Sequence, residues 1–310
     1  MAFSASDVKA LRDKTGVGMM DCKKALTEAD GDLDRAIDIL RERGLAAATK
    51  KASRIAAEGV VLAYSEGDVS VLVEVNSETD FVSKIPEFNN FVAGVAKTIA
   101  AQNPADVDAL LAMTIAGGSD TVEEARQAVV LKSGENVSIR RFERVAGNPA
   151  VVSYVHGGGS IGVLAVFNTD DATAKSEAFA AMGRDVAMQI AAMSPQYLSK
   201  DTVPADVVEK EKAICKAQLA EDPKMANKPE KVLENIIVGR VGKFYKEVCL
   251  LDQPFVKDGD ISVGQYVQNV AKELGASIEA VNFFRCVKGE GLEKRQDDFA
   301  AEVAAAAGQG

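Results

Sequence analysis

The chain has 310 residues, of which 47% are hydrophobic and 26% charged, a composition typical of globular proteins and not of a disordered tail. Lys and Arg total 36 and Asp and Glu total 46, so the net charge is −10. This acidic balance argues against a protein that binds nucleic acid directly, because such binding needs a cationic surface. The longest apolar runs have the length of strands, so we expect no membrane span.

The four cysteines and the one histidine restrict the chemistry that the chain can carry. Cys22, Cys215, Cys249 and Cys286 form no C-x-x-C pair, and His156 alone excludes a three-histidine metal site. Isolated thiols and the lack of a secretory leader predict a protein of the reducing cytoplasm, with no metal site.

Residues 1–54 have the pattern of three short helices. Ser4 and Asp7 have the spacing of a capping box, which predicts the start of the first helix. Asp32 is a plausible N-cap of the third helix, and Gly44 is expected to end it. The sequence therefore predicts a small three-helix domain.

Residues 55–147 combine strands and helices. Two β-rich runs flank a turn at Gly67, which predicts a hairpin. A helix is expected to begin at Pro86, another to end at Gly134, and a third strand to cover residues 136–145. This pattern predicts a first α+β subdomain.

The pattern then recurs. The string VLVEVN (71–76) resembles VLAVFN (163–168), and each lies in a predicted hairpin before a helix. We expect a second, related subdomain over 148–195 and 245–288, with YKEVCLL (245–251) as its third strand. The similarity of two apolar strings also arises by chance, so duplication is one of two interpretations.

Two further segments complete the predicted fold. Residues 196–244 contain two helical stretches joined by a polar turn with prolines, which predicts an inserted antiparallel helical hairpin of the coiled-coil type. Residues 289–310 are expected to form a C-terminal helix. The predicted fold class is therefore α+β.

The most tempting catalytic motif is HGGGSIG (156–162). It contains G-x-S-x-G, but a nucleophile elbow needs a helix after Ser160 and a histidine later in the chain, and the chain has neither. A dinucleotide loop also needs a helix after the glycines. We expect a glycine-rich hairpin turn, with no catalytic residue, and no phosphate loop or bound cofactor elsewhere.

Two other strings contain residues that could contact a partner. Phe81 lies in the polar loop SETDFV (77–82), so it either packs into the core or contacts a partner; Asp80 beside it could be a helix cap. Met19 and Met20 are adjacent at a helix start and cannot both face one core. One of them is therefore expected to be exposed.

Five strings together resemble the bacterial translation elongation factor Ts family. They are TGVGMMDCKKAL (15–26), NSETDFVSK (76–84), HGGGSIGVL (156–164), QPFV (253–256) and GEGLEK…DFAAEV (289–303). They run in the family's order over nearly the whole chain.

The resemblance implies a guanine nucleotide exchange factor for elongation factor Tu in translation, not an enzyme. It implies a ubiquitin-associated-like N-terminal domain, two related core subdomains, the helical hairpin and a C-terminal helical module. The implied partner is Tu, both GDP-bound and nucleotide-free. The resemblance allows a homodimer or a 2:2 complex with Tu.

Specific residues match the family's contacts with Tu. The segment implied to dislocate Mg²⁺ from Tu consists of Thr79, Asp80, Phe81 and Val82. Other matching contact positions are Arg12, Met19, Met20, Lys23, Gly134, His156 and Val256. Ser160 stands where the family pattern leads us to expect a basic residue.

Two other functions compete with exchange. A serine hydrolase built on Ser160 would need a histidine after the serine. A passive scaffold would bind Tu without accelerating GDP release, and it fits the repeat, the hairpin and the acidic charge as well as exchange does. Cys22, in the proposed contact helix, is expected to be buried filler with no redox role.

Overall fold

The computed structural model describes residues 3–147, 150–222, 225 and 228–293, and it confirms the α+β fold class. The chain forms two compact units. Unit 1 consists of Met1–Arg144, Gly157–Ile161 and Cys286–Gly310; unit 2 consists of Val145–His156 and Gly162–Arg285.

Unit 1 begins with the three predicted helices, α1 (Ala5–Thr15), α2 (Met19–Glu28) and α3 (Leu33–Lys51). Ser4 and Asp7 form the predicted capping box, and the Asp32 side chain accepts from the Arg35 N–H at the start of α3. The helices share a core of their own, made of Val8, Leu11, Val17, Cys22, Ala25, Leu26, Ala29, Ala36 and Leu40.

The prediction that Gly44 ends the third helix is wrong, because α3 continues for another two turns. Gly44 is buried in the middle of α3 and faces α6 (Val122–Ser133). A Cβ atom at Gly44 would lie 3.4 Å from the Gln127 carbonyl oxygen of α6. The glycine therefore serves the close approach of two helices, and the residues after it contain no helix breaker.

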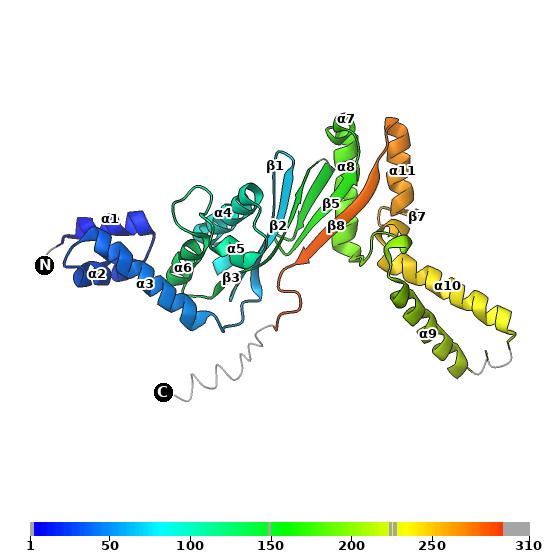
Figure 1. The fold of residues 1–310 in the computed structure, drawn as a ribbon, viewed down its shortest axis with the longest axis horizontal. Coiled ribbons are helices and arrows are strands. Elements are labelled where there is room, and N and C mark those ends of the chain that lie inside the picture. Colours follow the sequence, from blue (N-terminus) through cyan, green and yellow to red (C-terminus); the bar gives the residue numbers. More distant parts are fainter. Residues whose placement is uncertain (1–2, 148–149, 223–224, 226–227, 294–310) are drawn as a thin grey trace. The chain divides into compact units, whose positions relative to one another are not determined.

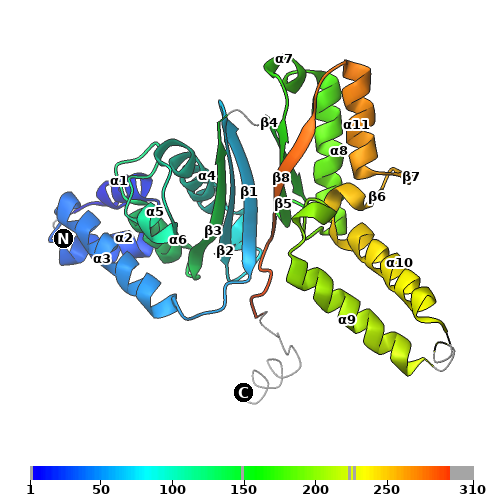
Figure 2. The same ribbon diagram turned by 45° about the vertical axis from the view of Figure 1, so that its right-hand side comes forward.

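The first sheet has the order β1-β2-β3, formed by β1 (Glu58–Glu66), β2 (Val69–Ser77) and β3 (Val137–Ala146). β1 and β2 pair antiparallel through the predicted turn, where Gly67 has φ +60°. The helices α4 (Pro86–Gln102), α5 (Val107–Leu111) and α6 lie on one side of this sheet (Figures 1 and 2).

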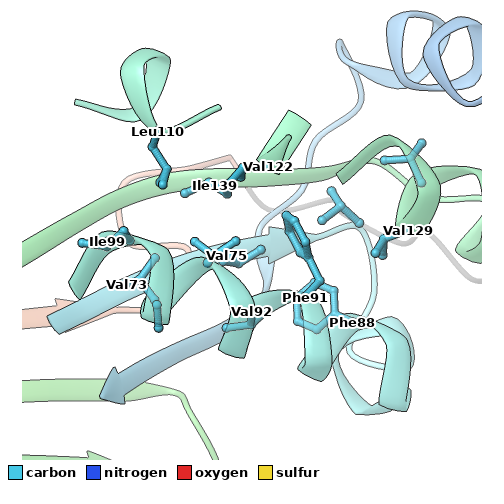
Figure 3. Packing of buried hydrophobic residues seen from close by; sticks show 14 of the residues in the cluster. Val73, Val75, Phe88, Phe91, Val92, Ile99, Leu110, Val122, Val129 and Ile139 are labelled. Carbon is cyan, nitrogen blue, oxygen red and sulfur yellow. The ribbon is translucent and has the colours of Figure 1, made fainter. Parts of the chain in front are cut away.

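Apolar side chains from these helices and strands form the core of unit 1. Figure 3 shows Phe88, Phe91 and Val92 of α4 gathered with Val73 and Val75 of β2 in one buried cluster. Val73 and Val75 of β2 are part of this cluster. The loop that follows β2 therefore begins at a strand that is packed into the core.

Unit 2 contains most of a second sheet with the order β4-β5-β8. Its strands are β4 (Ala150–His156), β5 (Ile161–Asn168) and β8 (Glu279–Val287). The helices of this part are α7 (Asp171–Ala174), α8 (Glu177–Met193) and α11 (Val263–Leu274), with a small β6-β7 sheet (Pro254–Phe255 and Asp258–Ser262) beside them.

The expected third strand at 245–251 is wrong. Helix α10 (Glu230–Val248) extends through most of that segment, and β8 is the strand that pairs with β5. Ile237, Val241 and Tyr245 recur every four residues and pack in the same cluster. That spacing predicts a helix, whereas the β-rich string YKEVCLL taken alone predicts a strand.

The two sheets share features that favour two related halves. Each has a hairpin whose second strand pairs with a strand from later in the chain. The helices α4 and α8 are both 17 residues long. Each ends at a residue in the left-handed region, Asn103 with φ 49° and Ser194 with φ 50°.

The predicted helical hairpin consists of α9 (Ala205–Glu221) and α10, which lie side by side in Figures 1 and 2. Cys215 and Leu219 of α9 pack against Ile237 and Val241 of α10. The C-terminal helix predicted over 289–310 lies mostly on residues 294–310, outside the described part of the chain, and the described residues 289–293 are not helical. Among the described residues, the helices are too short or too polar to cross a bilayer.

A buried carboxylate lies in the middle of β2. The Glu74 side chain has no exposed surface, and it accepts hydrogen bonds from Arg140 Nη1 at 3.1 Å and Arg141 Nε at 2.7 Å, both on β3. Asn76 Nδ2 donates to the same carboxylate at 3.1 Å. The charge is therefore paired and hydrogen-bonded, as a buried charge must be.

The same carboxylate binds the segment that follows β8. The Gly289 N–H donates to Glu74 Oε1 at 2.7 Å, and Cys286 Sγ lies 3.3 Å from Glu74 Oε2. Gly289 has φ +67°, and a Cβ atom there would lie 2.2 Å from the Ala57 carbonyl oxygen, so only glycine fits. Burial raises the pKa of Glu74, but the hydrogen bonds from Gly289, Asn76 and Arg141 outweigh it and hold the pKa below its usual value.

We predict that Glu74→Ala lowers the free energy of unfolding by roughly 1–3 kcal/mol, because it leaves the buried Gly289 N–H without its acceptor. The stabilisation from Glu74 is present above the ordinary glutamate pKa and is lost as the pH falls through the lowered folded-state pKa. Urea unfolding at several pH values measures both effects. The exposed Glu66→Ala change is the control and should stay within about 0.5 kcal/mol of wild type.

Candidate functional site

The loop between β2 and α4 places one apolar residue outside the protein and the next one inside. The short 3₁₀ turn η1 (Val82–Lys84) follows Phe81, and Val82 is buried. The Phe81 side chain is 76% exposed. Of the two alternatives for Phe81, the structure therefore supports exposure and contradicts packing into the core.

Asp80 has one side-chain partner, and it is an exposed one. Lys84 Nζ lies 2.5 Å from Asp80 Oδ2, and the same ammonium lies 5.7 Å from the centroid of the Phe81 ring, within cation–π range. The hydrogen bond from Lys84 holds the pKa of Asp80 below its usual value. Neither η1 nor α4 has a side-chain cap, so the expectation that Asp80 is a helix cap is wrong.

The loop is joined to the turn after α6. The Thr79 N–H donates to Glu135 Oε2 at 2.9 Å, and the Thr79 hydroxyl donates to Glu135 Oε1 at 2.7 Å. Glu135 follows Gly134, which ends α6 in the left-handed region with φ +76°. The structure thus brings the predicted residues Thr79 and Gly134 close together through Glu135. Sequence analysis missed Glu135, because no local pattern links residues so far apart.

The N-terminal group of predicted residues lies on α1 and α2. Met19 is 43% exposed and Met20 is 62% exposed, so both methionines face solvent where one was expected. Lys23, one turn further along α2, and Arg12 on α1 are exposed as well. Cys22 between them is fully buried, and burial raises the pKa of its thiol, which agrees with a packing role.

The remaining predicted residues, His156 and Val256, belong to unit 2. His156 is exposed at the end of β4, and its Nδ1 lies 2.9 Å from the Tyr154 hydroxyl oxygen. The Val256 side chain is 51% exposed, and its N–H donates to Gln189 Oε1 at 2.9 Å. Both side chains therefore face solvent. A hydrogen bond holds the ring of His156 in place, and another holds the backbone of Val256.

The glycine-rich string forms the predicted hairpin turn between β4 and β5. The Ser160 hydroxyl donates to the Gly157 carbonyl at 2.8 Å, so it closes the turn. Gly159 has φ +97°, and a Cβ atom there would lie 2.3 Å from Val60 Cγ2. A strand follows Ser160, which contradicts a nucleophile elbow and with it the serine hydrolase. In the described ranges, no cluster of three or more His, Cys, Asp or Glu residues has the arrangement of a metal site.

Comparison with known proteins identifies the family. The family model described as "Elongation factor TS" matches residues 78–290. A protein of Syntrophotalea carbinolica named "Elongation factor Ts" is 50% identical over 305 residues, covering 98% of this chain and 99% of the relative. The namesake from Trichlorobacter lovleyi is also 50% identical, over 99% of both chains, and that from Magnetococcus marinus is 44% identical over 98% of both. The chain therefore belongs to the elongation factor Ts family.

Proposed function

We propose that the chain is the guanine nucleotide exchange factor for elongation factor Tu. The observation that carries this proposal is the exposed Phe81 side chain beside the Asp80 carboxylate, on a loop fixed at both ends. Aromatic side chains are enriched in protein–protein interfaces, so this exposed ring is well suited to contact a partner. Membership of the elongation factor Ts family supports Tu as that partner.

In the proposed mechanism, the chain binds Tu·GDP and Phe81 enters beside the Mg²⁺ site of Tu as a wedge. Asp80 then competes for the network that holds the ion against the GDP phosphates. Loss of Mg²⁺ removes the largest local positive charge, so GDP binds less tightly. Thr79 and Val82 hold this segment in place, one by hydrogen bonds and the other by burial.

Thermodynamic linkage requires that the effect is mutual. If the bound factor weakens GDP binding, GDP weakens the binding of the factor by the same ratio, roughly 5–150-fold for typical coupling energies. The exposed residues elsewhere would supply the contact area that offsets the strain in Tu. They are Arg12, Met19, Met20, Lys23, Gly134, His156 and Val256. GTP binding to Tu then releases the factor.

This function needs no covalent chemistry, so the chain would not be an enzyme and would need no cofactor of its own. We propose that it acts in the cytoplasm on GDP-bound and nucleotide-free Tu, without direct contact with nucleic acid. A homodimer and a 2:2 complex with Tu both fit this proposal. The alternative function is a scaffold that binds Tu without exchange.

We predict that the wild-type chain strongly accelerates release of fluorescent GDP from Tu in a stopped-flow experiment. The Phe81→Ala change should slow this release roughly tenfold, which corresponds to about 1.4 kcal/mol of lost transition-state stabilisation. The double change Asp80→Ala/Phe81→Ala should return release to nearly the spontaneous rate.

Leu45→Ala is the control, because Leu45 on α3 is 54% exposed and its loss also removes an exposed apolar side chain. Its release rate should equal that of wild type. If the wild-type chain binds Tu but leaves the rate of GDP release unchanged, the scaffold is correct and exchange is not.

We further predict that Lys84→Met raises the pKa of Asp80 toward the ordinary aspartate value. The change removes the hydrogen bond that lowers this pKa, so the carboxylate of the variant protonates at a higher pH than that of wild type. An NMR titration of the Asp80 carboxyl carbon in the free chain measures the midpoint. Equal midpoints in the two proteins would contradict the Lys84–Asp80 ion pair.

A further inference from the structure

Two glutamate side chains connect the Phe81 loop and the turn after α6, because each accepts a hydrogen bond from a backbone N–H of the other segment. Glu78, in the loop, accepts from the Asn136 N–H at 2.6 Å. Glu135, in the turn, accepts from the Thr79 N–H at 2.9 Å. Each carboxylate therefore satisfies a backbone donor of the opposite segment. We call these two contacts, with the Thr79 hydroxyl bond to Glu135, the glutamate bracket.

Further contacts fix the bracket to the rest of unit 1. Asn136 is 5% exposed, and its Nδ2 donates to the Arg54 carbonyl at 2.9 Å. Arg54 Nη1 also lies 3.3 Å from Glu78 Oε1. Ser77 Oγ donates to the Thr79 carbonyl at 2.8 Å. The bracket therefore holds the loop to the start of β3 and to the segment before β1, and not to a single flexible neighbour.

The bracket ends immediately before the two residues proposed to act on Tu. Thr79 carries the last of these bonds, and Asp80 and Phe81 follow it directly. An exposed phenylalanine on a free loop would fold onto nearby apolar surface, and binding would then have to reorder the backbone. Fixing the backbone of one residue costs about 1–2 kcal/mol of conformational entropy. A loop that is already fixed avoids this cost when it binds.

We propose that Glu135 is a positioning residue for nucleotide exchange. It touches neither Phe81 nor Asp80 in any contact of the described chain; it acts through Thr79, whose N–H and hydroxyl it holds together. The proposal rests on the proposed exchange function and adds a residue that lies 54 positions beyond the loop's Phe81 in the chain. Charge-assisted hydrogen bonds to two donors make the carboxylate well suited to this task.

The test compares Glu135→Ala with Glu135→Gln. The glutamine can rebuild the bracket, because its Oε1 accepts from the Thr79 N–H and its Nε2 donates to the Thr79 hydroxyl oxygen. Glu123→Ala is the matched control, since Glu123 lies on α6 and also accepts two bonds from one partner, Arg126, at 2.7 Å each. Its loss removes a similar local network that, among the described residues, has no bond to Thr79, although Arg126 Nη1 also donates to the Val137 carbonyl at 2.8 Å.

Three measurements are made on each full-length variant: release of fluorescent GDP from Tu over a range of factor concentrations, amide hydrogen exchange at Thr79, and urea unfolding. We expect Glu135→Ala to lose protection of the Thr79 amide and to lose roughly tenfold in GDP release, about 1.4 kcal/mol. Glu135→Gln should keep most of both. Glu123→Ala should keep GDP release at the wild-type rate even where its stability falls.

The outcomes separate this proposal from the exchange function. The Glu135→Ala variant could lose the protection of the Thr79 amide against hydrogen exchange and still accelerate GDP release from Tu as much as wild type. In that case Glu135 has no positioning role and the proposal is wrong. The same holds if Glu123→Ala loses as much exchange as Glu135→Ala, because the effect then follows stability. A wild-type chain that does not accelerate GDP release overturns the exchange function and this proposal with it.

A second variant covers the case in which Glu135→Ala does not fold. Thr79→Val removes the hydroxyl bond to Glu135 and keeps the backbone bond, with little change in shape. We expect it to slow GDP release relative to the wild-type chain, and Thr79→Ser to restore the rate; a Thr79→Val variant as fast as wild type would overturn the proposal. A Thr79→Ser variant as slow as Thr79→Val would contradict a role for the hydroxyl bond.

Discussion

The Glu74 carboxylate sets the arrangement of unit 1, because a buried charge tolerates no missing partner. It lies in a strand that is almost entirely buried. Its partners come from β3 and from the segment after β8, so three distant parts of the chain must meet at one point. The sheet, the register of β3 next to β2 and the path of the final segment all follow from satisfying this one group.

The number and kind of hydrogen-bond partners that a carboxylate has in this protein vary with how deeply it is buried. Glu74 is fully buried and accepts from groups of five residues, whereas Glu78 and Glu135 near the surface each accept a backbone N–H. Among the described residues, the ion-pair partner of Asp80 is the exposed Lys84. Exposed ion pairs contribute little free energy, so Asp80 can exchange its partner at small cost. In the proposed mechanism, this weak pairing would let Asp80 leave Lys84 for a group on Tu.

Local signals in the sequence predicted local structure well. The caps at Ser4 and Asp32 were confirmed because side chain and backbone donor lie within one helical turn. Gly44 was misjudged because a glycine that ends a helix and a glycine that lets two helices approach look alike without the partner helix. The pairing of Glu135 with Thr79 depends on long-range folding, which no local pattern encodes.

Unit 1 is discontinuous, and this has a consequence for how the chain is made. A ribosome synthesises the N-terminus first, so α1–α3, with a core of their own, can fold early. The β1-β2-β3 sheet reaches its final state later, since the Gly289 N–H that donates to Glu74 follows all of unit 2 in the chain. Until then the Glu74 carboxylate remains hydrated. All of unit 2 between residues 162 and 285 is therefore synthesised before the first sheet can reach its final, dry state.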